Sequence, residues 1–120
     1  MDVVNGYRKT KGLAPLARSA ALEDFSGKAA ESDASTGKPH GYFIQTSGGK
    51  GLSFAQNEIP GWPLASYQTL TKLIDSGTLM MFNEGPGGGH YEAIVGKYTS
   101  IGCGIHVKTD GRVWVSQDFK

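Results

Sequence analysis

The residues best suited to chemistry lie between Glu84 and His90, where a carboxylate is followed by the glycines Gly87–Gly89 and then an imidazole. Glycine permits positive φ and the close approach of other groups, at a cost in folding entropy. A carboxylate can orient a histidine for acid–base chemistry. The stretch therefore predicts a pocket shaped by its glycines. The alternative interpretation is a mobile surface loop that carries a stray histidine, and this stretch alone leaves both open.

Motifs typical of hydrolases are absent from the sequence, which has no HExxH pair and no Gly-x-Ser-x-Gly elbow. Cys103 is the sole cysteine, so no internal disulfide can form. Alternation along residues 101–107 predicts that its thiol points into the core and is inert. Ser47, Ser53 and Ser100 are available as nucleophiles, but their spacing places none of them beside a histidine. The residues therefore favour a non-catalytic role and leave the question of an enzyme open.

The composition narrows the classes of partner. A chain of 120 residues predicts one domain spanning residues 1–120. The net charge of +1, without a basic run, argues against nucleic acid. The longest apolar runs are too short to span a bilayer. The opening residues Met1–Val4 lack the basic start and apolar core of a signal peptide, which indicates a cytosolic chain or a mature segment.

Three helices are expected to position the stretch. The first two follow Asp2 and Ser19, which can cap a helix N-terminus. The third ends at Gly85–Pro86, so Glu84 lies at a helix C-terminus, where the dipole disfavours a carboxylate unless a cation is near. The spacing of apolar residues gives the bounds 2–11, 19–32 and 66–83.

A β-hairpin is predicted at the end of the chain. Asp110–Gly111 is a strong turn signal between two alternating runs, 100–107 and 112–119, which must pair antiparallel because their connection is short. A further short strand is expected over Leu52–Asn57, with a turn at the prolines that follow. Residues 34–51 are expected to be irregular.

Several motifs, taken together, resemble those of the CAP superfamily, which comprises cysteine-rich secretory proteins, insect-venom antigens and pathogenesis-related proteins. The closest likeness is Gly89–Val95, which resembles the family's "GHYTQVVW". The other matching segments are Asn5–Arg8 with Gly12–Leu16, Gln56–Ile59, Ile101–Gly104 and Trp114–Phe119. They occur in family order over nearly the whole chain.

The resemblance implies an α+β fold, a three-layer α-β-α sandwich with an antiparallel central sheet. It also implies a cavity that holds two histidines and two acids, which fall here on His40, Glu58, Glu84 and His90. The chain departs from the family in having no disulfide, in carrying Met81 where a tryptophan is usual, and in its short segment before His90. These departures are typical of a compact microbial member.

By the same resemblance, His40 and His90 are the expected ligands of a divalent metal such as zinc, with Glu58 and Glu84 within hydrogen-bonding reach of the imidazoles. The four groups could equally form a network without metal or perform acid–base chemistry. An apolar groove for a small or sterol-like ligand is a further expectation, and ordinary core is its alternative. The candidate groove residues are Phe54, Ile59, Trp62, Leu64 and Tyr67.

Three functions follow as hypotheses. The first is a secreted, non-catalytic, monomeric CAP domain whose cleft binds a divalent metal and a small or lipidic ligand. The second is a metal-dependent hydrolase, a peptidase or an esterase, that uses the same cleft. The third is a structural interaction module at a microbial surface.

Overall fold

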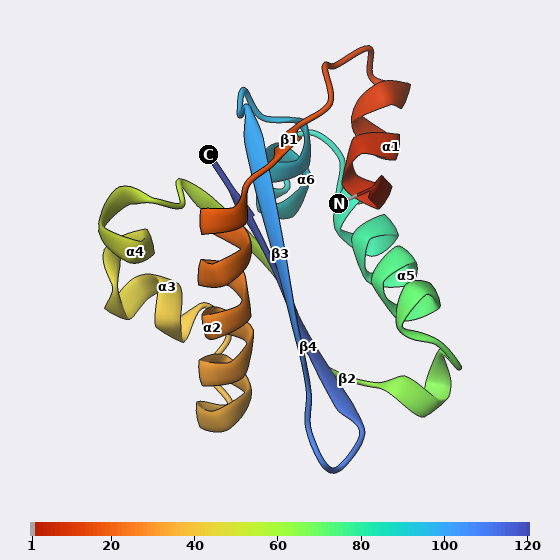
Figure 1. The fold of residues 1–120 in the computed structure, drawn as a ribbon. Coiled ribbons are helices and arrows are strands. Elements are labelled where there is room, and N and C mark those ends of the chain that lie inside the picture. The colour runs from red at the N-terminus through yellow and green to blue at the C-terminus, as the bar shows by residue number, and fades with distance from the viewer. Residues whose placement is uncertain (1) are drawn as a thin grey trace.

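A four-stranded sheet with the order β1-β3-β4-β2 is the centre of the computed structural model, which describes residues 2–120 (Figure 1). The strands are β1 (Ala17–Arg18), β2 (Ala55–Pro63), β3 (Ser100–Val107) and β4 (Arg112–Phe119). The three long strands pair antiparallel, as expected. The two-residue β1 pairs with β3 in parallel, so the sheet as a whole is mixed rather than purely antiparallel. A parallel pair is feasible because a long crossover separates these two strands in sequence.

Helices cover both faces of this sheet, which confirms the three-layer α-β-α arrangement (Figure 1). The helix α2 lies on one face, and α1, α5 and α6 lie on the other. The helices are α1 (Asp2–Thr10), α2 (Ala20–Thr36), α3 (Gly41–Gln45), α4 (Ser47–Gly51), the 3-10 turn η1 (Leu64–Ser66), α5 (Leu70–Phe82) and α6 (Gly89–Val95). None of the helices within residues 2–120 combines the length and hydrophobicity needed to cross a lipid bilayer.

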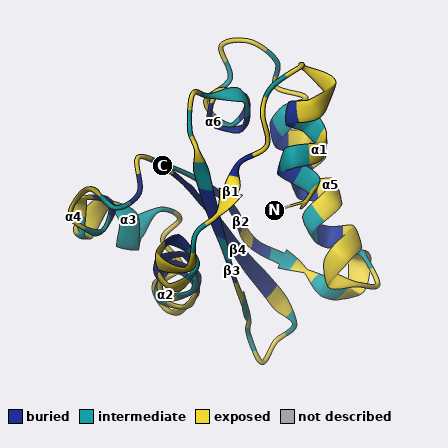
Figure 2. Cartoon of the chain, turned by 45° about the horizontal axis from the view of Figure 1, so that its top comes forward, coloured by how far each residue is buried: buried dark blue, intermediate teal, exposed yellow. Residues whose placement is uncertain are grey.

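The two faces of the sheet differ in chemistry. The face toward α1, α5 and α6 carries the main apolar core, including Val113, Val115 and Phe119 of β4 (Figure 2). The face toward α2 has only a small apolar cluster of Ala30, Ala34 and Trp114. Its remaining buried positions on β4 are the polar residues Ser116 and Asp118. Buried polar side chains therefore lie between α2 and the sheet.

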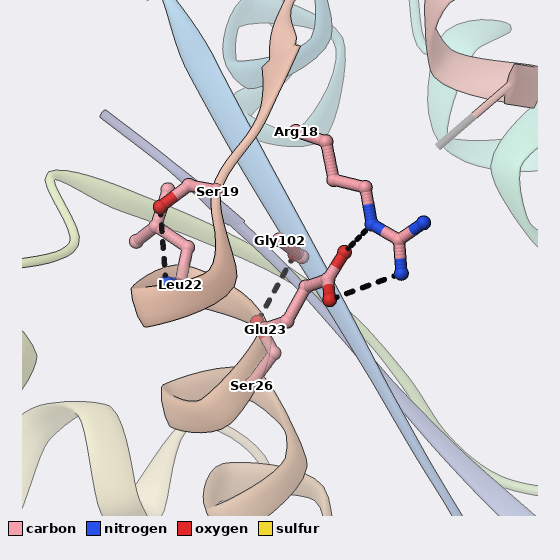
Figure 3. Close-up of polar contacts among 6 residues, drawn as sticks. All are labelled: Arg18, Ser19, Leu22, Glu23, Ser26 and Gly102. Atoms are coloured by element: carbon pink, nitrogen blue, oxygen red, sulfur yellow. Dashed lines mark hydrogen bonds and ion pairs between the residues drawn. The ribbon is translucent and has the colours of Figure 1, made fainter.

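Two glycines of β3 allow α2 to lie directly on the sheet. A Cβ atom at Gly102 or Gly104 would lie 2.3 or 2.2 Å from backbone atoms of α2. The hydroxyl oxygen of Ser26 lies 3.0 Å from the carbonyl oxygen of Gly102 (Figure 3). The Gly-Cys-Gly motif thus sets the height of α2 above the sheet, and with it the depth of every side chain that α2 points inward.

The start of α2 is fixed by its own side chains. Ser19 caps the helix as predicted, since its hydroxyl accepts from the amide of Leu22 at 3.2 Å (Figure 3). The Arg18 guanidinium bridges to the Glu23 carboxylate one turn into the helix (Figure 3). The predicted helix is present, but it continues four residues beyond the expected end at 32, to Thr36, and is capped by Gly37, which has a φ of 69°.

The strand β2 overturns the prediction of a turn at the prolines. It runs from Ala55 through Pro60 to Pro63 and pairs with β4 along its length. A proline is tolerated there because β2 is an edge strand, where the missing amide needs no partner. Gly61, with a φ of 73°, carries a register shift between Pro60 and Trp62.

Residues 34–51 are not irregular as expected, because they complete α2 and form two short helical segments, α3 and α4. Within α4, Gly48, Gly49 and Lys50 have φ values of 63°, 65° and 58°, so this turn is left-handed. Side chains resist that conformation. At Gly48 a Cβ atom would also lie 2.4 Å from the carbonyl oxygen of Ser53, so the position needs glycine.

The third predicted helix is shorter at its start than expected. It begins at Leu70 rather than near residue 66, because Gln68 has a φ of 71° and Thr69 caps the helix by accepting from the amide of Lys72 at 3.1 Å. The segment 89–95, for which no element was predicted, is the helix α6.

The terminal hairpin pairs as predicted, but three of its inward-pointing residues on β3 are partly or largely exposed. Cys103 lies on the core face and packs against the main core while remaining partly exposed. Burial raises the pKa of its thiol. The alternation that points Cys103 into the core also points Ile105 and Val107 the same way, yet these two residues are 45% and 44% exposed. Their cross-strand partners Val115 and Val113 are buried, so at this end of the hairpin the core covers β4 and leaves these positions of β3 exposed.

Candidate functional site

A cavity of about 350 Å³ opens at the edge strand β2. One wall comes from the loop after α2, the floor from β2, and the other wall from α5 and the start of α6. Its lining residues are Pro39, His40, Glu58, Ile59, Pro60, Trp62, Gly77, Met80, Met81 and His90. Three of the four predicted cleft residues therefore line one cavity, and the fourth, Glu84, is bonded to His90 beside it.

His40 enters the cavity from the loop between α2 and α3, where its backbone has a φ of 59°. Its Nδ1 lies 2.8 Å from Oε1 of Gln56. Its backbone amide donates to Oε1 of Glu58 at 2.9 Å. The ring and the main chain of His40 are thus both held by side chains of β2.

Behind Gln56 lies a buried carboxylate, Asp118 of β4, which is completely inaccessible to solvent. The side-chain amide of Gln56 lies 3.0 Å from Oδ1 of Asp118. The hydroxyls of Ser26, Ser53 and Ser116 donate to the same carboxylate at 2.5, 2.7 and 3.0 Å. Burial raises the pKa of Asp118, while these hydrogen bonds act in the opposite direction.

Glu58 is a second buried carboxyl group, with 5% of its surface exposed. Burial, and then a hydrogen bond to Asp33 of α2, raise the pKa of Glu58 to about 9. Oε2 of Glu58 and Oδ2 of Asp33 are both buried without another hydrogen-bond partner. With its pKa raised to about 9, Glu58 keeps its proton at neutral pH and can donate it to the Asp33 carboxylate.

His90 comes from the opposite wall, at the second residue of α6. Its Nδ1 lies 2.5 Å from Oε2 of Glu84, and its backbone amide donates to Oε1 of Glu84 at 3.1 Å. The side chains of His90 and Glu84 are 39% and 34% exposed. The hydrogen bond to His90 lowers the pKa of Glu84. A Cβ atom at Gly88 would lie 2.4 Å from Cβ of Glu84, so this glycine admits the carboxylate.

The location of Glu84 explains how a carboxylate is tolerated after the end of α5. Although the C-terminus of α5 disfavours negative charge, the carboxylate turns toward the first amides of α6, where the helix dipole favours it. The imidazole of His90 adds a donor on the same carboxylate. The expected compensating group near Glu84 is therefore a helix N-terminus together with an imidazole.

Two residues that sequence reasoning did not single out fix the position of α6. Asn57 of β2 donates to the carbonyl of His90 at 3.1 Å. Arg8 of α1 is buried and donates to the carbonyls of Ile94 and Gly96, at 2.9 and 2.8 Å, at the far end of the helix. Burial lowers the pKa of Arg8. A cation at the C-terminus of a helix is favourable.

Of the five candidate groove residues, two line the cavity and three lie outside its lining. Ile59 and Trp62 line the cavity. Tyr67 stacks on Trp62 with ring centroids 5.5 Å apart, and Leu64 packs against the main core. Phe54 lies outside the cavity lining, is 59% exposed, and has the ammonium of Lys120 at 5.9 Å from its ring centroid. The groove predicted from sequence is thus represented in the cavity by two of its five members.

The donor set of the cavity can be compared with what a metal requires. Within residues 2–120, no group of three or more His, Cys, Asp or Glu side chains is placed to hold one ion. Two imidazoles remain, each with Nδ1 against an oxygen and Nε2 without a partner among the hydrogen bonds of these residues. Holding Nδ1 in this way is the usual arrangement behind a metal-binding Nε2. The set fits an open site with two protein ligands and water.

Comparisons with known proteins agree with this architecture. A sequence model described as the cysteine-rich secretory protein family, CAP, matches residues 1–119. No curated protein sequence matches the chain. Among solved structures, a cysteine-rich secretory protein from Staphylococcus aureus subsp. aureus Mu50 is similar in fold, with a TM-score of 0.59 and 21% identity. The likeness covers 99% of this chain and 36% of that one, so the chain spans about a third of the longer protein.

Proposed function

The chain belongs to the cysteine-rich secretory protein (CAP) family, and on that premise we propose that its cavity binds a divalent metal, such as zinc, through His40 and His90. The cavity also has room for a small apolar ligand beside the two imidazoles. We further propose that the protein works outside the cell. The family's description as secretory supports this location.

One observation carries the metal proposal. Both imidazoles line the same cavity while an oxygen occupies Nδ1 of each, so the nitrogen left for a ligand is Nε2 in both rings. Neutral imidazole is a common zinc ligand, and a site with only two such ligands keeps open positions for water. Such a site is weaker than a closed structural one. Its affinity falls in acid because protons compete for the same nitrogens.

The walls of the cavity support the ligand proposal. Ile59, Trp62, Met80 and Met81 add apolar side chains to the lining of the cavity, which also contains the two imidazoles. Its volume of about 350 Å³ lies at the lower end of the range for small-molecule pockets, which is roughly 300–1,000 Å³. This volume favours a small apolar group, such as a short acyl chain, over a complete sterol. Methionine side chains can adapt to such a ligand.

Calorimetric titration with zinc tests the metal proposal. We expect the chelator-treated protein to bind one zinc ion, and the variants His40→Ala and His90→Ala to lose most of that binding. The matched control is His106→Ala, because His106 lies on β3 opposite Trp114 and outside the cavity lining. The proposal is wrong if both cavity variants bind zinc as well as the parent protein does.

Hydrolysis in the same cleft is the second candidate, and one observation favours it. Glu58, whose pKa is raised to about 9, lines the cavity with the two imidazoles, and a neutral carboxylic acid can donate a proton. Against it, the residues that line the cavity include no serine, threonine or cysteine among those described. The hydrolase predicts turnover on a panel of esters and peptides that disappears in both His90→Ala and Glu58→Gln. No turnover above background would remove this candidate.

A further inference from the structure

We propose that Asp118 is a positioning residue for His40. Acting through Gln56, it fixes the His40 imidazole as the tautomer that is protonated at Nδ1, and so leaves the lone pair on Nε2. The tautomer is a property of the protein alone. Only the identity of what binds at Nε2 rests on the proposed function.

The side-chain amide of Gln56 is oriented by the Asp118 carboxylate. Its Nε2 lies 3.0 and 3.3 Å from the two oxygens of Asp118. An amide nitrogen donates and a carboxylate oxygen accepts, so this orientation makes a hydrogen bond. The reversed amide would place oxygen against oxygen in a buried site, where an unpaired polar group is costly. Asp118 therefore decides which end of the amide faces His40.

The end of the Gln56 amide that faces His40 is its oxygen. Oε1 of Gln56 lies 2.8 Å from Nδ1 of His40. A carbonyl oxygen cannot donate, so Nδ1 must carry the hydrogen. A neutral imidazole has only one N–H, and Nε2 consequently has the lone pair.

Asp118 is itself held in place by its strand and by three serine hydroxyls. Asp118 and Gln56 are directly paired across β4 and β2, on the sheet face that α2 covers. The carboxylate accepts hydrogen bonds from the hydroxyls of Ser26 on α2, Ser53 just before β2, and Ser116 on β4 itself. The orientation of His40 is thereby linked to the strand register and to the depth of α2, both of which are fixed by the fold.

The test is ring-nitrogen NMR of metal-free, chelator-treated protein at a pH where the imidazoles are neutral. We expect His40 of the parent protein to be mostly the Nδ1–H form. In Asp118→Ala we expect the Nε2–H form, which free histidine favours in water, to become the major one. Ser116→Ala is the matched control, because it removes one donor to Asp118 and keeps the acceptor for Gln56. It is expected to leave the tautomer of His40 unchanged.

Two variants of Gln56 keep the test decisive if Asp118→Ala does not fold. Gln56→Met removes the side chain that connects Asp118 to His40. As in Asp118→Ala, we expect the Nε2–H form of His40 to become the major one. Gln56→Glu retains an oxygen toward Nδ1, and with one proton held between the new carboxyl group and Asp118 in place of the amide hydrogen it is expected to keep the Nδ1–H form. His90 is the internal reference, since its Nδ1 bonds directly to Glu84.

The inference is overturned if parent His40 is mainly the Nε2–H form, or if Asp118→Ala and Gln56→Met both leave the Nδ1–H form in place. Zinc titration of the parent separates this result from the proposed function. A parent protein with the expected tautomer that binds no zinc would contradict the metal proposal and support the role of Asp118.

Discussion

The two imidazoles of the cavity are held by different physical means. His40 is fixed through a neutral amide by a carboxylate that is wholly buried under α2. His90 bonds directly to Glu84, and both of these side chains are more than one-third exposed. We refer to these as the buried arm, comprising the half-buried His40 and Gln56 and the buried Asp118, and the exposed arm, comprising His90 and Glu84.

The difference indicates how each arm is coupled to the rest of the molecule. Hydrogen bonds in a buried network are strong, and leaving one of its members unpaired is costly. An exposed hydrogen bond between side chains that water can also reach contributes little to stability. Changes in the buried arm should therefore affect folding and binding together, whereas changes in the exposed arm should affect binding alone.

The largest effect is expected from Asp118→Ala, which leaves Gln56 and three serine hydroxyls without their common acceptor. We expect it to reduce the free energy of unfolding by about 3 kcal/mol, measured by urea denaturation. The matched change in the exposed arm, Glu84→Ala, should alter stability little. Equal losses in the two variants would break the distinction between the arms.

A smaller effect is expected from Gly104→Ala, which acts on the buried arm at a distance. The added methyl would lie 2.2 Å from the backbone of α2 and lift the helix that carries Ser26 and Asp33. We expect a loss of about 2 kcal/mol, as is typical of overpacking. Gly27→Ala is the control on the same helix, because its Cβ has no neighbour within 4 Å. It should gain up to about 1 kcal/mol. Similar losses in both variants would contradict the close contact.

The two glutamates should respond oppositely to pH. The pKa of Glu58 is raised to about 9, so the folded protein holds a proton there that the unfolded chain releases above its ordinary pKa of 4.5. This contribution to stability is complete below pH 4.5 and is lost as the pH rises toward 9. The pKa of Glu84 is lowered, so its contribution is present above the ordinary value and is lost in acid.

Thermal unfolding from pH 5 to pH 9 in chelator checks this contrast. The parent should lose several degrees of Tm relative to Glu58→Gln as the pH rises, since glutamine stays neutral, whereas Glu84→Gln should run parallel to the parent over this range. Parallel curves for the parent and Glu58→Gln would contradict a protonated Glu58.

The smallest effect is expected from Glu84→Gln on zinc binding. The amide oxygen can still accept from His90, so affinity should fall by about tenfold, with Tm unchanged. Gln56→Met should weaken zinc binding and also lower Tm. Calorimetry and thermal unfolding of the two variants provide the comparison, and a fall in Tm for Glu84→Gln would place the exposed arm in the same class as the buried one.

The sequence predicts the exposed arm far better than the buried one. Glu84 and His90 are six residues apart and separated by glycines, so their proximity can be inferred locally. Gln56 and Asp118 are 62 residues apart and meet only through the register of β2 on β4. Neither belongs to a catalytic motif. A buried network of neutral donors therefore leaves no local pattern.

The same limit applies to the fold. The helices and the hairpin follow from caps, apolar spacing and Asp110–Gly111, all of which are local signals. The course of β2 through Pro60 and Pro63 was predicted wrongly, because tolerance of proline depends on being at the sheet edge, a property of the whole sheet. The left-handed turn at Gly48–Lys50 likewise depends on tertiary contacts such as that of Gly48 with Ser53.

If the two arms bind one metal, they do so through Nε2 of each histidine. A crystal structure of the zinc-loaded protein, with anomalous data at the zinc edge, locates the ion and its ligands. We expect a single strong peak about 2.0–2.1 Å from Nε2 of both His40 and His90, with Nδ1 still hydrogen-bonded to Gln56 and Glu84. A peak bound by only one of these histidines, or ligated through Nδ1, would contradict this expectation.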